Sequence, residues 1–494
     1  MIYTVLNETT FFQGISNYLN FFRYDNAIQD QLWSFLTNVT SSSVLDNHTI
    51  KTIMDTWTLQ EGYPLLTVTR NGVDNSISLA QRRYLLDPFA VNQTSIYVNP
   101  FTSFPFQWYI PFNYMTPSDS SSVYWLTPNQ TRTLANVVQP NEWIVFNVDE
   151  FGFYRVNYDE LNWRLLIDGL KTNHAAFSRV TRAQLIDDAF NLARSGDLNV
   201  TFALELSTYL INETDYVPHS TFSNNIQYPS LMFSQDEEST AYQNIQQFVR
   251  TLLSSRYDPS GWMIDASSAD YLTRQLRALI IRDLCANEYQ ICIDDAVTHY
   301  RQWLADMEGQ PIAPDVRSVA YCYGVKMGTV DDYERMRELY RQTNDQVEKN
   351  RFGYALTCTQ NETLLEQLLN ATLANDYIRL QDASRFINNI RLQPGGQKLA
   401  WDFVRRQWTE LVANFGSVSF TLSDIVESVL EYVNTQQDLD TVQNFIANTV
   451  DLSIAQRAFM SSIEKIQANI RWMNTVGRDM EAWLDERIGT EKRD

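Results

Sequence analysis

Long apolar segments are missing from this sequence of 494 residues. No apolar run reaches the ~18 residues that a membrane-spanning helix needs. Residues 1–8 contain neither a basic region nor an apolar core, so we do not expect a signal peptide. Residues 491–494, at the other end, supply no apolar tail for a lipid anchor. The sequence therefore indicates no direct membrane segment.

Positive charge is also scarce, because 38 Lys and Arg stand against 59 Asp and Glu, a net charge of −21. Such a chain repels nucleic acid and anionic lipid, so we expect no nucleic-acid partner. We interpret the negative charge as a solvated acidic surface. A surface that attracts basic peptides is the alternative, but charge alone cannot support it. Hydrophobic residues make up 44% of the chain and aromatic residues 13%, enough to build the two or three domains expected at this length.

Only four histidines are present, His48, His174, His219 and His299, and none has a second histidine four residues later. A zinc site of the H-E-x-x-H type needs two such histidines on one face of a helix. We interpret each histidine as a surface side chain or a locally bonded one. The nucleophile and phosphate motifs G-x-S-x-G, G-x-x-x-x-G-K-[ST] and G-x-G-x-x-G are missing too. The sequence thus predicts no catalytic and no metal-binding residue.

Neighbouring carboxylates occur in pairs such as Asp187-Asp188 and Asp294-Asp295. Adjacent residues on a helix point in different directions, so we do not predict an acid–base dyad at either pair. We assign both pairs to helix capping or solvation.

The four cysteines, Cys285, Cys292, Cys322 and Cys358, form no C-x-x-C pair, which argues against zinc knuckles and thioredoxin chemistry. Three disulfide pairings are possible in principle. A short loop between two helices could join Cys285 to Cys292, and Cys322 and Cys358 would then link distant helical turns. Four buried, reduced thiols remain the alternative on spacing alone.

Glycosylation sequons of the form N-x-T point mildly to an extracellular protein. They lie at Asn7, Asn38, Asn47, Asn92, Asn129, Asn199, Asn212, Asn361 and Asn370. The missing signal peptide conflicts with this indication. A helical apolar pattern also begins at Met1 and Ile2 without a capping residue before it, which favours a truncated, split or internally initiated product.

Apolar spacing divides the chain into three segments. Residues 1–56 have the pattern of short amphipathic helices. Residues 57–150 contain short β-rich runs at 65–70, 76–81, 106–112, 122–126 and 143–148, separated by turn signals, as a small β-sandwich requires. Residues 151–494 show successive helical patterns, for example at 183–194, 332–342 and 362–374, joined by short turns as in an α-solenoid-like stack. We interpret residues 228–240 as an exposed loop insertion.

Several motifs resemble the M1 family of zinc aminopeptidases, of the aminopeptidase N type with an ERAP-like C-terminal domain. Residues 57–64 read W-T-L-Q-E-G-Y-P, residues 151–159 read F-G-F-Y-R-V-N-Y-D, and residues 182–190 read R-A-Q-L-I-D-D-A-F. Residues 11–19 and 395–403 continue the resemblance, which covers nearly the whole chain. Where the family usually has Trp after Pro218, this chain has His219. The motif residues that we expect to have structural roles are Trp57, Gln60, Gly62, Tyr63, Pro64, Gly152, Tyr154, Arg155, Asn157, Tyr158, Asp187 and Asp188.

The resemblance implies a mainly α, multidomain α+β fold. It comprises the terminal helices of a thermolysin-like peptidase domain, a β-sandwich and a large helical domain. It also implies the disulfides Cys285–Cys292 and Cys322–Cys358. The family's zinc ligands, its G-A-M-E-N-type loop and its transition-state tyrosine have no counterpart here. We therefore expect zinc and peptide substrates to bind the catalytic half of the parent protein. A location outside the cell or on the outer face of the plasma membrane is implied, as is a possible homodimer through the helical domain.

Three hypotheses follow. The chain is the non-catalytic C-terminal part of an aminopeptidase, which caps the active-site cavity and confines the peptide. Alternatively, it is a stand-alone extracellular scaffold that binds peptides or proteins without catalysis. A hydrolase of unrelated mechanism finds no support in the motifs. No substrate-binding residue can be assigned from the sequence.

Overall fold

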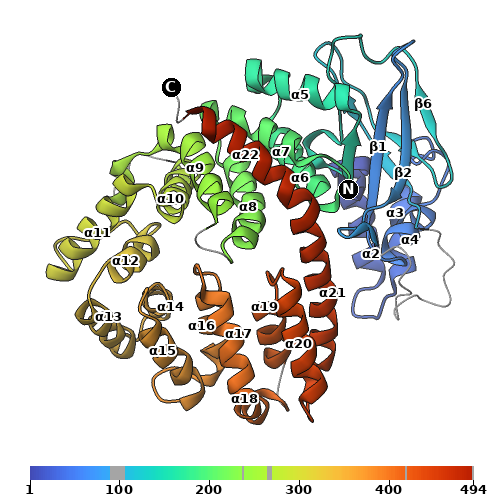
Figure 1. The fold of residues 1–494 in the computed structure, drawn as a ribbon. Helices are drawn as coiled ribbons and strands as arrows, with labels where there is room; N and C mark the ends of the chain where they lie inside the picture. Colours follow the sequence, from blue (N-terminus) through green and yellow to red (C-terminus); the bar gives the residue numbers. More distant parts are fainter. Residues whose placement is uncertain (90–105, 236–238, 264–269, 418–419, 492–494) are drawn as a thin grey trace. The chain divides into compact units, whose positions relative to one another are not determined.

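The computed structural model describes residues 1–89, 106–235, 239–263, 270–417 and 420–491. The protein is mainly helical with small β-sheets, in agreement with the predicted class. It forms two compact units, unit 1 from Met1 to Tyr209 and unit 2 from Leu210 to Asp494 (Figure 1).

Unit 1 begins with four short helices. These are α1 (Ile2–Leu6), α2 (Glu8–Phe21), α3 (Gln29–Val39) and α4 (Ile50–Thr58). Asn7 caps α2 by accepting a hydrogen bond from the Thr10 amide (3.1 Å), and Thr49 caps α4 in the same way through the Thr52 amide (3.1 Å).

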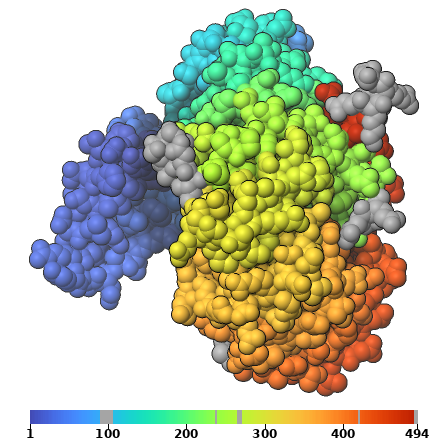
Figure 2. Space-filling model, turned by 90° about the vertical axis from the view of Figure 1, so that its left-hand side faces the viewer, coloured from blue at the N-terminus to red at the C-terminus, as the bar shows by residue number. Residues whose placement is uncertain are grey.

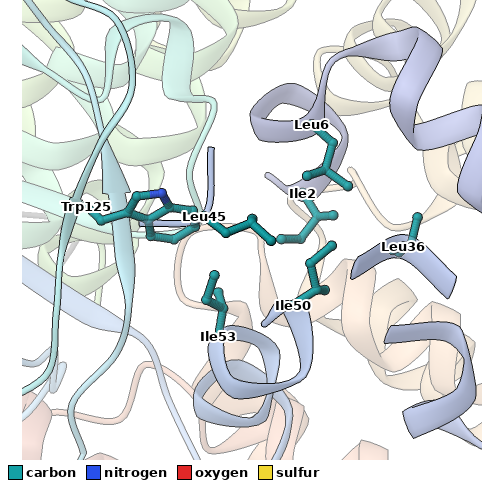
Figure 3. Close-up of a cluster of buried hydrophobic side chains, with 7 residues drawn as sticks. All are labelled: Ile2, Leu6, Leu36, Leu45, Ile50, Ile53 and Trp125. Atoms are coloured by element: carbon teal, nitrogen blue, oxygen red, sulfur yellow. The ribbon is translucent and has the colours of Figure 1, made fainter. Parts of the chain in front are cut away.

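The helices share one apolar core with a tryptophan of the following β-region. Figure 3 shows these side chains pointing toward one another: Ile2, Leu6, Leu36, Leu45, Ile50, Ile53 and Trp125. The indole of Trp125 also donates to the Val44 carbonyl (2.9 Å). Burial of these side chains attaches the helices to the sheets of the same unit.

A four-stranded sheet lies at the centre of unit 1, in the order β6-β2-β1-β8. Its strands are β1 (Pro64–Arg70), β2 (Ile77–Arg83), β6 (Arg132–Leu134) and β8 (Arg155–Tyr158). β1 and β2 are antiparallel neighbours, whereas β1 and β8 are parallel, with Leu65 opposite Arg155. The turn before β1 uses Gly62 at φ 80°, a conformation that favours glycine, and Pro64 is the first residue of the strand.

Two small antiparallel pairs complete the β-sheets of the described residues. They are β3 (Ile110–Phe112) with β5 (Tyr124–Leu126), and β4 (Tyr114–Met115) with β7 (Val145–Phe146). The runs predicted at 106–112, 122–126 and 143–148 thus contain strands, but each strand is shorter than predicted. At 143–148 the backbone leaves the extended conformation at Asn147 (φ 58°). The side chain of Asn147 instead donates to the carbonyls of Gly152 and Tyr154 (both 3.1 Å).

Three further helices close unit 1: α5 (Glu160–Asn173), α6 (Arg179–Ser195) and α7 (Val200–Ser207). α6 covers the predicted helix at 183–194 and buries Leu185, Ala189, Leu192 and Ala193 as the periodicity predicts. Gly196 ends α6 at φ 79°, the left-handed conformation of a helix C-terminus.

Unit 2 consists of helices in sequence order. They are α8 (Tyr216–Phe233), α9 (Thr240–Leu253), α10 (Tyr271–Ala286), α11 (Gln290–Ala305), α12 (Arg317–Lys326), α13 (Val330–Gln342), α14 (Gln346–Leu356), α15 (Glu362–Ala374), α16 (Ala383–Arg391), α17 (Gly396–Arg406), α18 (Trp408–Phe415), α19 (Thr421–Val429), α20 (Gln436–Asn448), α21 (Gln456–Trp472) and α22 (Arg478–Glu491). The predicted helices at 332–342 and 362–374 correspond to α13 and α15. Figure 2 shows segments of unit 2 following one another from green through yellow to orange over one face.

The chain of unit 2 returns to its own beginning, because α22 packs against α9 (Figure 1). The Asn244 amide donates to the Asp485 carboxylate (2.6 Å), and the rings of Phe248 and Trp483 meet edge to face at 5.5 Å. A π-helical turn at Met473–Gly477 joins α21 to α22.

The interpretation of residues 228–240 as a loop is wrong for the first part of that range. α8 continues to Phe233 with Pro229 inside it, and Met232 and Phe233 are buried. Tertiary burial of this apolar end outweighs the helix-breaking tendency of proline. Residues 236–238 lie outside the described residues.

Both expected disulfides are present in unit 2, Cys285–Cys292 and Cys322–Cys358. The first disulfide links the end of α10 to the start of α11. The second links Cys322 in α12 to Cys358, which lies just after the end of α14. All four cysteines are buried, and no free cysteine is found.

Candidate functional site

An ion-pair cluster in unit 1 brings together residues from two of the recognised motifs. β8 presents Arg155, and α6 presents Asp187 and Asp188. The guanidinium Nη1 of Arg155 lies 2.6 Å from Asp187 Oδ2 and 3.1 Å from Asp188 Oδ1. Asp188 Oδ2 also accepts the Val156 amide hydrogen at 3.1 Å. The cluster therefore fixes α6 to the edge strand of the sheet.

This geometry corrects the assignment of Asp187-Asp188 to helix capping or solvation. Both carboxylates of this pair contact one guanidinium, and the Asp188 side chain is only 5% exposed. At the other pair, Asp295 accepts a hydrogen bond from the Tyr257 hydroxyl (2.5 Å), while Asp294 accepts one from the exposed Gln290 (2.8 Å). Periodicity could not reveal a partner that lies on a distant strand.

Burial controls the electrostatics of the cluster. Loss of solvation raises the pKa of Asp188 to about 7, against the opposing effect of the Arg155 guanidinium. Burial and the charge of Asp187 likewise raise the pKa of Glu150. Burial lowers the pKa of Arg155, but the charges of Asp188 and Asp187 outweigh it, so the net pKa is raised.

A pocket of about 390 Å³ opens beside the cluster. Six of the motif residues line it: Tyr63, Gly152, Tyr154, Arg155, Asp187 and Asp188. Its other walls are Glu150, Phe151, Phe153 and Met1. The ring of Tyr63 stacks on Tyr84 at 5.4 Å and contacts Phe153 at 5.2 Å. The pocket combines aromatic walls with more carboxylates than cations.

The remaining motif residues lie elsewhere in unit 1, and the polar side chains among them hydrogen-bond to main-chain groups or, at Asn157, also to another side chain. The Trp57 indole donates to the Tyr109 carbonyl (3.0 Å), and the Gln60 amide donates to the Gln107 carbonyl (2.9 Å). Asn157 accepts from the Trp163 indole (2.9 Å).

The hydroxyl of Tyr158 accepts the Phe146 amide hydrogen at 2.9 Å.

The sequence analysis assigned no role to Arg70, which is buried in the structure. Its guanidinium donates to the carbonyls of Pro140 (3.0 Å) and Glu142 (2.6 Å). The sequence signal that could have identified Arg70 is its position as the one charged residue in an otherwise uncharged strand.

The raised pKa of Asp188 gives a pH-dependent prediction. The folded state holds the proton with a pKa of about 7, above the ordinary value of 3.8, so the free energy of unfolding should fall as pH rises between these values. We expect Asp188→Asn to remove a decline on the order of 2 kcal/mol between pH 4 and pH 7. Urea unfolding at several pH values measures it. The exposed Asp168→Asn serves as control, and identical slopes in wild type and Asp188→Asn would contradict the prediction.

The four histidines lie apart and contact aromatic rings or main chain. His48 packs against Tyr109 (4.7 Å) and His174 against Tyr209 (5.9 Å). His299 stacks on Trp262 (5.6 Å). His219 is buried, and its Nε2 lies 3.3 Å from the Glu213 carbonyl. Burial lowers the pKa of His219.

Among the residues that the structure describes, no group of three or more His, Cys, Asp or Glu side chains could hold a metal ion. The described ranges also contain no helix with the length and apolar character required to cross a membrane.

Two of the pockets among the described residues of unit 2 are neighbours. The α10 pocket, of about 390 Å³, is lined by residues of α8, α9, α10, α12 and α14, including Arg282, Tyr323 and Tyr354. The α15 pocket, of about 690 Å³, is lined by residues of α9, α12, α15 and α17, including Gln246, Leu365 and Lys398. Both include the Lys326–Glu288 ion pair (2.9 Å) in their walls, so the pockets adjoin.

The sequon asparagines within the described residues are all exposed. They are Asn7, Asn38, Asn47, Asn129, Asn199, Asn212, Asn361 and Asn370. Asn92 lies outside the described residues. Asn7, Asn199 and Asn361 cap helices through their side-chain oxygens, which leaves the side-chain nitrogen for other bonds.

Comparison with known proteins gives a consistent result. Residues 143–468 match the family described as ERAP1-like C-terminal domain. Aminopeptidase Ey of Gallus gallus is 33% identical over 490 residues, which cover 98% of this chain and 49% of that protein.

Two further relatives show the same coverage. Aminopeptidase N of Homo sapiens is 30% identical over 492 residues, 98% of this chain and 50% of that protein. The thyrotropin-releasing hormone-degrading ectoenzyme of Homo sapiens is 30% identical over 498 residues, 99% of this chain and 46% of that protein. This chain thus spans about half the length of the curated relatives it matches. It belongs to the family of the ERAP1-like C-terminal domain and corresponds to the C-terminal half of an M1 aminopeptidase.

Proposed function

We propose that this chain is the non-catalytic C-terminal portion of an M1-type aminopeptidase that removes N-terminal residues from peptides. It would cap the active-site cavity and confine the peptide. The observation that carries the proposal is the match to aminopeptidases along 98% of this chain but only about half of theirs.

Three domains follow from the proposal. Residues 1–56 would be the last helices of a peptidase domain, residues 57–150 a β-sandwich, and residues 151–494 a solenoid-like helical domain. Exposed apolar side chains on the first helices support the first assignment. Phe12, Leu19 and Phe21 on α2 are 55%, 62% and 71% exposed, as expected for a face that packs against further protein.

The zinc of the parent enzyme would bind outside this chain. The described residues supply no set of donors that fits a catalytic zinc, which needs three protein ligands and an open position. We therefore assign no step of peptide hydrolysis to the residues of this chain.

The α10 pocket of unit 2 supports the role in peptide confinement. Its wall carries aromatic, amide and charged side chains, the mixture that small-molecule and peptide sites use. The name of the thyrotropin-releasing hormone-degrading ectoenzyme supports an extracellular location. A homodimer through the helical domain belongs to the same proposal.

A chimera tests the proposal. We expect the isolated chain to show no chelator-sensitive hydrolysis of an amino-acid p-nitroanilide in the presence of zinc. A chimera that joins the N-terminal half of Gallus gallus aminopeptidase Ey to this chain should hydrolyse it, and that N-terminal half alone should be much less active. Turnover together with stoichiometric zinc in the isolated chain would contradict the proposal. Peptide binding by the isolated chain together with an inactive chimera would favour the scaffold alternative.

A further inference from the structure

The α15 pocket lies directly beside a glycosylation sequon. Residues Gln360 and Glu362 line this pocket of about 690 Å³, and Asn361 of the Asn361-Glu362-Thr363 sequon stands between them. Asn361 is exposed and caps α15. A group attached to its side chain therefore begins at a residue whose two sequence neighbours are part of the pocket wall.

The capping geometry leaves Asn361 ready for modification. Its Oδ1 accepts the Leu364 amide hydrogen at 3.2 Å, and its main-chain amide donates to the Thr359 hydroxyl at 3.3 Å. Within the described part of the chain, Nδ2 has no hydrogen-bond partner. The cap holds the carboxamide in one orientation and keeps its nitrogen available.

The chemistry of the walls suits a carbohydrate. Four glutamines, Gln243, Gln246, Gln360 and Gln393, line the pocket together with the hydroxyl of Thr359 and the ring of Tyr242. A carboxamide both donates and accepts hydrogen bonds, which matches the hydroxyl and acetamido groups of a sugar. An aromatic side chain supplies an apolar face with a polar end. The volume lies within the range of about 300–1,000 Å³ found for ligand sites.

Two charged residues of the wall remain without an ionic partner. Lys398 and Glu362 form no ion pair with any residue in the described ranges, whereas Lys326 pairs with Glu288 and Asp402 with Arg405. Hydrogen bonds to sugar hydroxyls can satisfy both groups without changing their charge.

We propose that an N-linked glycan on Asn361 occupies the mouth of the α15 pocket. The Nδ2 atom would lose a proton and form a bond to C1 of the first sugar. The bond from C1 to the phosphate of a lipid-diphosphate-linked oligosaccharide breaks, and the lipid diphosphate leaves. The covalent tether gives the sugar an effective concentration in the millimolar range, so weak contacts suffice to keep it there. The proposal goes beyond the function proposed above and rests on its extracellular location.

The test uses the full chain secreted from a eukaryotic host. Thr363→Ala removes the sequon but keeps the cap of Asn361, and Thr363→Ser keeps both. Thr363 is exposed, so neither change should affect folding. Glycopeptide mass spectrometry measures occupancy at Asn361. Acetylation by acetic anhydride then reports on access to Lys398, with the exposed Lys465 of α21 as reference.

We expect glycan at Asn361 in the wild type and in Thr363→Ser. In these proteins Lys398 should react at least about threefold more slowly than in Thr363→Ala, with Lys465 unchanged. Equal rates at Lys398 would overturn the placement of the glycan. Glycans at other sequons but none at Asn361 would overturn the site and leave the extracellular location standing. Secreted protein with no glycan at any sequon would overturn both.

Discussion

Arg155→Ala is expected to lower the free energy of unfolding of unit 1 by about 3–5 kcal/mol at pH 8, because it leaves a buried carboxylate without its cation. Arg155 lies between Asp187 and Asp188, and the Asp188 side chain is 5% exposed. The change also removes both ion pairs between α6 and β8, which leaves the hydrogen bond from the Val156 amide to Asp188. At pH 5 the loss should be smaller, since Asp188, with a pKa of about 7, is then protonated.

Urea unfolding followed by tryptophan fluorescence measures this effect. Arg164 provides the matched control, because its ion pair with Glu160 is exposed and four residues apart on one helix. Arg164→Ala should change the free energy of unfolding by less than about 1 kcal/mol. Asp188→Asn in the Arg155→Ala background should recover part of the loss. Equal effects of the two arginine substitutions would show that the cluster contributes no more than a surface pair.

Removal of the Cys322–Cys358 disulfide is expected to have the second largest effect. The Cys322–Cys358 disulfide closes a loop of 36 residues, whereas the Cys285–Cys292 disulfide closes a loop of seven residues. Chain entropy predicts a loss of about 4 kcal/mol for Cys322→Ala/Cys358→Ala and about 2 kcal/mol for Cys285→Ala/Cys292→Ala. The longer loop gives the unfolded chain more freedom when the bond is absent.

The two double variants control for each other, because all four cysteines are buried and each variant removes the same atoms. Guanidinium unfolding of both proteins measures the order of the effects. Denatured, oxidised wild type should contain no free thiol. A larger loss for the Cys285–Cys292 pair would contradict the entropic argument, and four titratable thiols in secreted wild type would contradict both bonds.

Local pattern predicted the helical part of this protein well. The repeat of apolar residues at 183–194 and 362–374 corresponds to α6 and α15, and in both helices these residues are buried. The resemblance to M1 aminopeptidases also identified the cysteine pairs that spacing left open. These features depend on residues close in sequence or on motifs that the family shares.

The local pattern of apolar and polar residues could not predict contacts between residues that are far apart in the sequence. Nothing in the pair Asp187-Asp188 reveals that Arg155 lies opposite. Residues 228–240 resemble a loop because of the acidic run Asp236-Glu237-Glu238, yet α8 continues to Phe233. The strands at 106–112 and 143–148 are shorter than predicted, because side-chain hydrogen bonds, such as those of Asn147, take the place of backbone hydrogen bonds between strands. The two pockets of unit 2 are lined by residues from up to five helices, so no single segment of the sequence could predict them.

The parallel pairing of β1 with β8 has a consequence for synthesis of the protein on the ribosome. Leu65 pairs with Arg155, and β2 to β7 all lie between the two strands in the sequence. Such a non-local pair forms slowly, and its second strand leaves the ribosome well after the first. The nascent chain must therefore carry β1 with one edge uncovered until Tyr158 has emerged. Chaperones that bind exposed strand edges would act during that interval.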